Sequence, residues 1–304
     1  MMKIVFLDSA IINPGDISWE SIESLGTFEN YKRSTRAEAL ERLQDADAAF
    51  TDSFPIDREI MEKCPKLKFI GIAATGFNHI DLEAAKELGI AVANVPAYAA
   101  NAVAQHAMAL LLALTNQVEV YNNAVGEGEW RQSEDYTFIK TPLTLLAGKS
   151  IGIVGYGDIG SKVAQMAEAF GMKVNIYSRD KEAAIKSDVV SLNCPLTKEN
   201  AGMINAEFIG QMKDGAILIN TARGGLVDEE ALAAALKSGK LAGAGLDVLS
   251  SEPPAEDNPL VGLENCYITP HIGFIPIEAR TVVIETCGAN LKSFVEGEEL
   301  NRVV

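Results

Sequence analysis

Short apolar runs rich in β-branched residues alternate along the chain with segments in which apolar residues recur every three or four positions. The first pattern is typical of strands and the second of amphipathic helices, so their alternation predicts a parallel α/β architecture. In the first hundred residues the expected strands are Lys3–Leu7, Ala48–Thr51, Lys68–Ile72 and Ile90–Asn94. They predict one small α/β domain.

Capping signals mark the helices between these strands. Thr35 and Glu38 form a capping box, and Asp57 and Asp81 are expected N-caps. Gly89 is placed to end the last of these helices.

Two segments separate this domain from a second one. Asn101–Asn116 reads as a helix that is apolar on nearly every side, which predicts burial at a domain or subunit junction. Gly126–Thr141 reads as an aromatic, glycine-containing loop.

The strand and helix alternation then restarts. A second sheet is expected from Ser150–Val154, Lys173–Tyr177, Asp188–Leu192, Ala216–Asn220 and Ala242–Val248. A final helix over Ile277–Glu296 follows this sheet and could pack on either domain.

Composition narrows the function classes. The 304 residues suffice for about two domains, and 48% hydrophobic with 22% charged residues is ordinary for a globular chain. The net charge of −16 disfavours nucleic acid and membrane partners, since a field of that sign repels phosphates.

Cysteines and the N-terminus point to a cytoplasmic protein without a metal site. The four cysteines form no C-x-x-C pair and have no histidine at ligand spacing. Asp8 interrupts the first apolar run too early for a signal peptide, and no apolar run is long enough to span a membrane.

A glycine-rich turn follows the first strand of the second sheet. In Ile151-Gly-Ile-Val-Gly155-Tyr-Gly157-Asp-Ile-Gly160, Gly155 permits the tight turn, Gly157 lets backbone approach a pyrophosphate, and Gly160 allows close packing of helix and strand. Its position between a strand and a helix predicts dinucleotide binding.

The residues after the next strand leave the choice between NAD and NADP open. Ser178 stands where an acid for the ribose 2′-hydroxyl is usual, and Arg179 follows it, which favours NADP. Asp180 matches the spacing of an NAD-type acid.

Three polar residues each follow a different strand of the second sheet. Arg223, Glu252 and His271 are expected at one sheet edge, where α/β folds place their sites. The other two histidines, His79 and His106, are read as a loop contact and a packed residue of the apolar helix. The three residues predict an anion clamp, a charge partner and a proton donor.

These motifs together carry a resemblance. The glycine turn, Asn-Thr-Ala-Arg223-Gly-Gly, Asp247 to Glu252-Pro-Pro and Thr-Pro-His271-Ile-Gly resemble, in this order, the D-isomer-specific 2-hydroxyacid dehydrogenase family over essentially the whole chain. Ile12 to Trp19, Ala74 to Asn78 and Val95 to Tyr98 look closest to its glycerate dehydrogenase (hydroxypyruvate reductase) members.

The resemblance implies an α/β fold of two domains. Residues 1–98 plus 275–304 would form a smaller flavodoxin-like substrate domain, and residues 99–274 a Rossmann-type dinucleotide-binding domain with a doubly wound parallel sheet. It also implies a homodimer through the nucleotide-binding domain.

The implied activity is hydride transfer between NAD or NADP and a small D-2-hydroxyacid/2-ketoacid pair, glycerate/hydroxypyruvate or glyoxylate. Arg223 would clamp the substrate carboxylate and His271 would donate the proton, while Glu252 would fix the tautomer of His271 and favour its imidazolium form. The implied cofactor-binding residues are Gly155, Gly157, Asp158, Ile159, Gly160, Ser178, Arg179, Cys194, Pro195, Thr221, Ala222, Asp247 and Gly273. The implied substrate-binding residues are Ala74, Thr75, Gly76, Phe77, Arg223 and His271.

One departure and two alternatives remain. The family usually has a longer stretch where only Ser178–Ser187 joins two strands here, which puts the adenine-side pocket in doubt. The alternatives are a nicotinamide-sensing protein-binding module, as in the family's corepressor branch, and a phosphoglycerate dehydrogenase lacking a regulatory domain. Formate oxidation is disfavoured because those relatives carry an amide at the position of Glu252.

Overall fold

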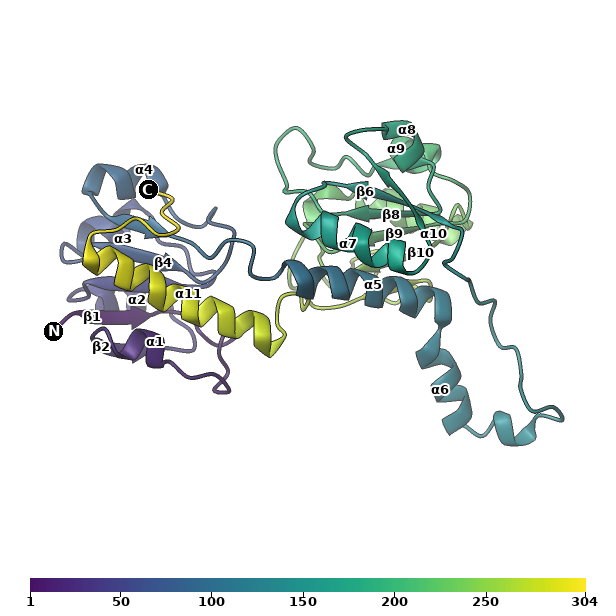
Figure 1. The fold of residues 1–304 in the computed structure, drawn as a ribbon, viewed down its shortest axis with the longest axis horizontal. Helices are drawn as coiled ribbons and strands as arrows, with labels where there is room; N and C mark the ends of the chain where they lie inside the picture. The colour runs from purple at the N-terminus through teal and green to yellow at the C-terminus, as the bar shows by residue number, and fades with distance from the viewer. The chain divides into compact units, whose positions relative to one another are not determined.

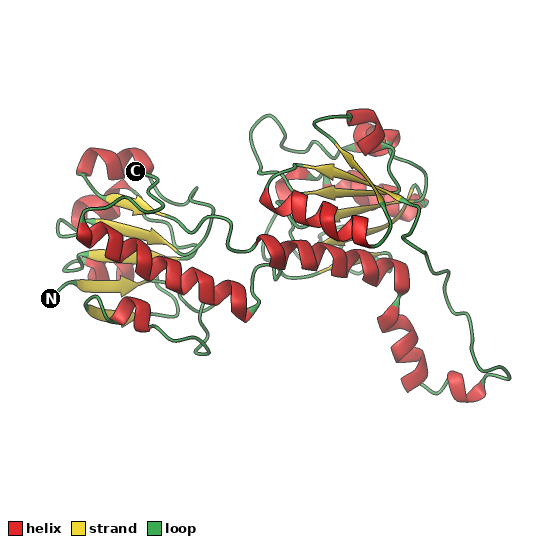
Figure 2. Ribbon diagram, viewed as in Figure 1, coloured by secondary structure: helices red, strands yellow, loops and turns green.

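The computed structural model describes all 304 residues and divides them into two compact units. The first unit comprises Met1–Tyr98 and Phe274–Val304, and the second comprises Ala99–Gly273. Each unit is a parallel sheet with helices on both faces (Figure 2). This confirms the α/β class and the two-domain fold.

The sheet of the first unit has five strands in the order β2-β1-β3-β4-β5, which is the flavodoxin-like order. The strands are β1 (Lys3–Phe6), β2 (Thr27–Asn30), β3 (Ala48–Thr51), β4 (Phe69–Ile72) and β5 (Ala91–Ala93). One face is covered by α2 (Arg36–Leu43), α3 (Arg58–Lys63) and α4 (Leu82–Leu88), and the other by α1 (Glu20–Glu23) and α11 (Ile277–Glu296).

The capping predictions in this unit are confirmed. Thr35 and Glu38 form a reciprocal capping box at the start of α2. The carboxylates of Asp57 and Asp81 accept hydrogen bonds from backbone N–H groups in the first turns of α3 and α4, and Gly89 ends α4 in the left-handed conformation. These devices act within one turn of chain, so sequence suffices to place them.

Two elements of this unit were not predicted. The edge strand β2 and the one-turn helix α1 lie between β1 and α2, in a stretch that lacks a clear apolar period. The structure also settles the position of the last helix, because Val283, Ile284 and Leu291 of α11 pack into the core of the first sheet.

The sheet of the second unit has six parallel strands in the order β11-β10-β9-β8-β6-β7. The strands are β6 (Ser150–Val154), β7 (Lys173–Ile176), β8 (Val189–Leu192), β9 (Ala216–Asn220), β10 (Leu241–Leu246) and β11 (Cys266–Ile268). One face is covered by α5 (Ala100–Asn116) and α7 (Asp158–Ala169), and the other by α8 (Lys181–Ile185), α9 (Ala206–Gln211) and α10 (Glu229–Ser238).

The helix α5 owes its apolar character to its own unit. Ala107, Leu110 and Leu111 lie in one core cluster with Ile151 and Ile219 of the sheet. The helix therefore covers one face of the sheet in the second unit, and this packing accounts for its apolar residues.

The connection from β7 to β8 is as short as the sequence indicated. It contains only α8 before the chain crosses to the other side of β6, so β7 is the edge strand. A third strand on that side, present in the commonest dinucleotide-binding order, is missing here.

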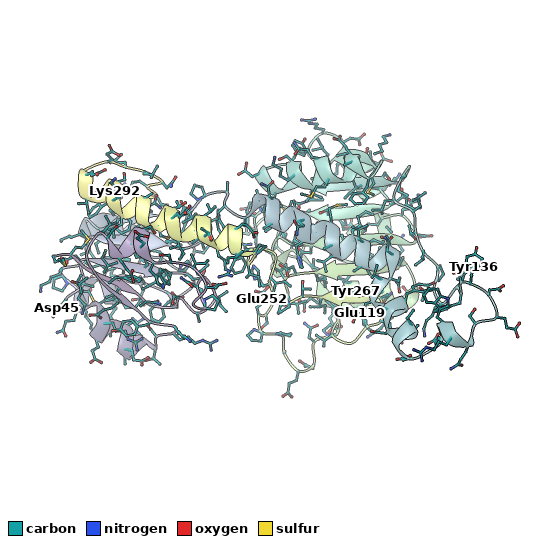
Figure 3. The ribbon with its side chains drawn as sticks, turned by 60° about the horizontal axis from the view of Figure 1, so that its bottom comes forward. Asp45, Glu119, Tyr136, Glu252, Tyr267 and Lys292 are labelled. Atoms are coloured by element: carbon teal, nitrogen blue, oxygen red, sulfur yellow. The ribbon has the colours of Figure 1, made fainter.

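The segment Val118–Leu145, here called the arm, leaves the end of α5 and returns to β6 (Figure 1). It contains α6 (Val118–Gly126) and a short 3₁₀ turn (Trp130–Gln132), neither of which was predicted. Its apolar side chains are largely uncovered: Tyr136 is 90%, Ile139 89% and Leu145 77% exposed. Tyr136 lies on the outer part of the arm (Figure 3).

The structure was also searched for membrane-spanning helices, disulfides and metal-binding clusters. No helix of the structure combines the length and the apolar composition that crossing a membrane requires. All four cysteines are free thiols, and no cluster of three or more His, Cys, Asp or Glu side chains could hold a metal ion.

Candidate active site

The glycine turn has the close contacts that require glycine. A Cβ at Gly155 would lie 2.6 Å from the backbone nitrogen of Cys194, and one at Gly160 would lie 1.9 Å from the carbonyl oxygen of Gly155. Gly155 also has a φ of +94°. Above Gly157 a Cβ would meet nothing within 4 Å, so open space faces the exposed start of α7 at Asp158. Ile159 follows within the first turn of that helix.

Two buried polar atoms near this turn have no partner within the protein. They are Oδ1 of Asn193, directly after β8, and Oγ1 of Thr221, directly after β9. Cys194 and Pro195 follow Asn193, and Ala222 follows Thr221, so all these residues lie at the carboxyl ends of neighbouring strands. Unsatisfied polar atoms and a glycine turn with open space fit a bound dinucleotide.

The two charged residues after β7, Arg179 and Asp180, have different contacts. Asp180 is the N-cap of α8, since its carboxylate accepts from the backbone N–H of Ala183 at 3.0 Å. Arg179 instead lies over the Tyr156 ring of the glycine turn, 5.4 Å from its centroid. Ser178 is exposed beside it. The cation and not the carboxylate is therefore turned towards the glycine turn.

Arg223 stands on a turn held by a fully buried asparagine. Asn220 accepts from the backbone N–H of Ala222 and donates to the carbonyl of Arg223, both at 3.0 Å. The exposed guanidinium of Arg223 donates only to the carbonyl of Ala222 among the protein's groups. A Cβ at the next residue, Gly224, would lie 1.9 Å from Leu249 backbone atoms. This glycine lets the loop of Arg223 touch the loop that carries Glu252.

Glu252 and His271 form a direct pair. Oε2 of Glu252 lies 2.7 Å from Nδ1 of His271, while Oε1 accepts from the backbone N–H of Leu249 at 3.1 Å. Because an ionised carboxylate only accepts, Nδ1 carries the hydrogen of this bond, which fixes the tautomer of a neutral His271 ring. Both side chains are about two-fifths exposed, so a ligand could reach them.

His271 has an unusual backbone that neighbouring groups hold in place. Its φ is +54°, a region that non-glycine residues rarely adopt. Its N–H donates to the carbonyl of Asp247 at 2.9 Å, and the carboxylate of Asp247 accepts from the N–H groups of Ile272 and Gly273, each at 2.8 Å.

The Asp247 carboxylate is buried and ionised. Burial on its own raises the pKa of Asp247, but the nearby His106 and the hydrogen bonds from Thr269 and two backbone amides outweigh it and hold the pKa below the usual range. A charged carboxylate that accepts three hydrogen bonds therefore fixes the segment on either side of His271.

The predicted substrate loop belongs to the first unit. Ala74, Thr75, Gly76 and Phe77 follow β4. The hydroxyl of Thr75 donates to the carbonyl of Val95, the carbonyl of Thr75 accepts from the Asn94 amide, and both distances are 2.8 Å. The loop is thus tied to the segment after β5, and Phe77 is left partly exposed.

Sequence reasoning missed three groups that shape the site: Tyr156, Asn220 and Gly224. All three stand inside motifs that the sequence analysis recognised, and that position was the available signal. His106 is packed and hydrogen-bonded as predicted, but its partners Thr269 and Asp247 could not be predicted because they are more than 140 residues away.

Comparisons with known proteins point to one family. Residues 108–273 match the model of the D-isomer specific 2-hydroxyacid dehydrogenase NAD binding domain. The chain is 44% identical to a hydroxypyruvate reductase of Blautia hydrogenotrophica, over 99% of each chain.

Two solved structures of similar fold contain cofactors. An acyclic imino acid reductase in complex with NADPH and D-Arg has a TM-score of 0.85, with 30% identity over 100% of each chain. A D-lactate dehydrogenase of Aquifex aeolicus, complexed with NAD and lactic acid, has a TM-score of 0.84, with 31% identity over 99% of each chain.

The family model, the relative and the two structures cover the same fold, and the strand-end residues of the site stand in the second unit as the motifs indicated. The protein is an oxidoreductase that uses a nicotinamide cofactor to transfer a hydride between a 2-hydroxyacid and its 2-ketoacid. The chain belongs to the D-isomer-specific 2-hydroxyacid dehydrogenase family.

Proposed function

We propose that this protein reduces a small 2-ketoacid, hydroxypyruvate or glyoxylate, with NADPH as the preferred donor. The observation that carries the catalytic part is the pairing of Glu252 with Nδ1 of His271 at 2.7 Å. This pairing leaves proton chemistry to the other ring nitrogen, beside the strand ends that would hold a dinucleotide.

His271 is the proton donor in reduction and the proton acceptor in oxidation. Nε2 gives its proton to the substrate oxygen, and the carboxylate of Glu252 stabilises the charged ring before that transfer. A bound nicotinamide supplies the hydride for the keto carbon. The glycine turn from Gly155 to Gly160 would hold its pyrophosphate, and Thr221 and Ala222 would lie near the ring.

Arg223 binds the substrate carboxylate. Its guanidinium is exposed and always charged, and it offers two parallel donors to a planar anion. The Asn220 bonds and the contact at Gly224 fix the backbone from which it extends. In the first unit, the backbone N–H groups of the Ala74–Phe77 loop are further donors that suit an anionic substrate group.

NADPH is favoured by what surrounds the end of β7. A ribose 2′-hydroxyl is usually bound by a free carboxylate, but Asp180 is committed to capping α8. Arg179 is positioned over Tyr156 and can pair with a 2′-phosphate. A second cation lies two residues further along the chain: Lys181 is over the ring of Tyr177, 5.6 Å from its centroid.

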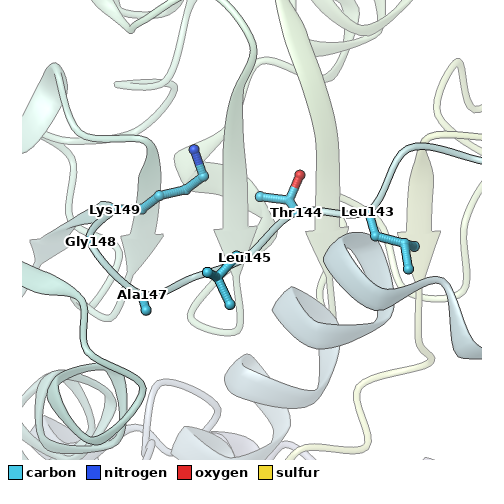
Figure 4. Close-up of a pocket in the computed structure, with 6 residues that line it drawn as sticks. All are labelled: Leu143, Thr144, Leu145, Ala147, Gly148 and Lys149. Atoms are coloured by element: carbon cyan, nitrogen blue, oxygen red, sulfur yellow. The ribbon is translucent and has the colours of Figure 1, made fainter.

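We also infer a homodimer built on the second unit. Six apolar side chains of the arm besides Trp130 are exposed: Val118, Val125, Tyr136, Ile139, Leu143 and Leu145. A shallow hollow next to the base of the arm is lined by residues between Leu143 and Lys149 (Figure 4). A monomer that left this surface in water would be unusual, and a twofold partner can cover it.

One assay tests the activity. The purified protein is offered hydroxypyruvate, glyoxylate, pyruvate and phosphohydroxypyruvate with NADPH or NADH. We expect the highest kcat/KM with hydroxypyruvate or glyoxylate and NADPH. Preference for phosphohydroxypyruvate would instead indicate a phosphoglycerate dehydrogenase, and tight NADPH binding without turnover of any ketoacid would indicate a sensing module.

The cofactor preference has its own test. Arg179→Ala should raise the KM for NADPH and leave that for NADH nearly unchanged, because only the former carries the 2′-phosphate. Lys198→Ala, an exposed lysine of the same unit, is the matched control for loss of one positive charge. An equal change for both cofactors would refute the role of Arg179.

A further inference from the structure

His106 contacts the catalytic segment from the opposite side. It lies in the middle of α5, and its Nε2 is 2.8 Å from Oγ1 of Thr269 and 3.2 Å from Oδ1 of Asp247. A Cβ built at Gly273 would lie 3.6 Å from the His106 side chain and 3.0 Å from Oδ2 of Asp247. The imidazole is therefore packed against the backbone that follows His271.

The direction of the hydrogen bonds follows from counting protons. Oγ1 of Thr269 lies 2.6 Å from Oδ1 of Asp247, and an ionised carboxylate can only accept. The single hydroxyl hydrogen of Thr269 is thus donated to Asp247, and the hydroxyl oxygen can only accept from His106. Nε2 of His106 must carry a hydrogen, which defines its tautomer.

This chain of bonds ends on the residues around His271. His106 donates to the hydroxyl of Thr269, and Thr269 donates to the carboxylate of Asp247. The same carboxylate accepts from the backbone N–H groups of Ile272 and Gly273. The positive φ of His271 is strained and persists only where surrounding groups impose it.

We propose that His106 is a positioning residue for the reduction, acting through Thr269 and Asp247 to hold the backbone of His271 in the conformation that pairs its ring with Glu252. The inference rests on the proposed role of His271 as proton donor. His106 itself contacts no substrate.

The kinetic test compares two substitutions at this position. His106→Leu removes the donor, and His106→Gln keeps an N–H at a similar reach. We expect His106→Leu to lower kcat about tenfold or more with little change in the KM for NADPH, since a small misplacement of a catalytic group is costly. His106→Gln should recover most of the loss. Gln105→Leu, an exposed neighbour on α5, is the matched control.

A double substitution tests the route. Thr269→Val should reproduce the loss of kcat, and His106→Leu combined with Thr269→Val should cost no more than either alone, because both break one chain of bonds. Unchanged kcat in His106→Leu, equal losses in the Leu and Gln variants, or additive losses in the double variant would each overturn the proposal.

A spectroscopic readout does not depend on turnover. The chain has only three histidines, so imidazole ¹⁵N spectra of the full-length protein can be assigned by single substitutions. His106 should show a hydrogen on Nε2 with slow exchange, and Thr269→Val should speed that exchange. An Nε2 without hydrogen would overturn the proposal even if the wild-type protein reduces ketoacids. An inactive wild-type protein with the expected spectrum would refute the proposed function instead.

Discussion

Arg223 combines an exposed guanidinium with a backbone fixed by Asn220, so its substitution tests the clamp with little disturbance of the fold. Arg223→Lys should lose about 2–4 kcal/mol of transition-state stabilisation, roughly a 30- to 1000-fold fall in kcat/KM, because a point charge cannot replace two parallel donors. Steady-state kinetics with hydroxypyruvate measure it. Kinetics like those of the wild-type protein would refute the clamp.

Glu252 bonds His271 through one oxygen and Leu249 through the other. Glu252→Gln keeps the shape of the side chain but removes the negative charge beside Nδ1 of His271. The kcat of ketoacid reduction should therefore fall, while the Kd for NADPH stays nearly unchanged, because the carboxylate contacts the ring of His271 and no cofactor-binding residue. Steady-state kinetics and NADPH titrations on the same sample check this. An unchanged kcat would mean that Glu252 does not act on the proton donor.

At the scale of elements, the carboxyl ends of β1 and β3 place two carboxylates together. Asp8 accepts from the backbone N–H groups of Asp52, Ser53 and Phe54 at 2.7–2.9 Å, so it holds the loop after β3. Burial, with the nearby charge of Asp8, raises the pKa of Asp52 to about 7. The first unit therefore carries an acid that is neutral when folded below that pH.

The raised pKa of Asp52 has a definite sign for stability. The pKa of an unfolded aspartate is about 3.9, well below the value of about 7 for Asp52 in the folded protein. Below about pH 3.9 Asp52 is protonated in both states and does not change the free energy of unfolding. As the pH rises from about 4 to 7, the unfolded state releases the proton more readily, so the folded protein loses stability. Asp52→Asn should stabilise the protein by about 2–4 kcal/mol at pH 8 and by little at pH 4. Thermal melts at both values test this, with Glu299→Gln as an exposed control. A gain of equal size at both pH values would contradict it.

At the scale of the whole molecule, the arm predicts assembly. Sedimentation at micromolar concentration should show twice the 32.6 kDa chain mass, because association buries the apolar surface of the arm. Ile139→Asp together with Leu145→Asp should give a monomer, since both side chains are almost fully exposed in one chain. A wild-type monomer under these conditions would remove the argument.

The outer part of the arm carries a second prediction at this scale. Some residue between Trp130 and Phe138 should approach the substrate of the partner subunit. Trp130→Ala would then raise the KM for the ketoacid while the protein stays dimeric, as kinetics and sedimentation on the same sample can show. An unchanged KM would leave this segment as a subunit contact alone.

Helix ends, the glycine turn and most strands were predictable from sequence because each depends on a few neighbouring residues. The capping box at Thr35 and Glu38 and the buried strand Ser150–Val154 are examples. The edge strand β2 and the helix α6 were not, since β2 gains its hydrogen bonds only from β1 and α6 has a single fully buried residue, Ala124. The local sequence pattern is a weak predictor of an element whose stabilising contacts come from a distant segment or are few.

The sequence by itself determined that Arg223, Glu252 and His271 lie at one edge of the second sheet, because each follows a strand and parallel strands end at one edge. Only the tertiary structure shows that Asp180 caps α8 while Arg179 lies over the Tyr156 ring, since capping of α8 depends on where the chain turns after β7. The same holds for His106, whose partners Asp247 and Thr269 reach it only when α5 packs on the sheet. Hydrogen bonds between distant segments depend on three-dimensional distance, which no local pattern encodes.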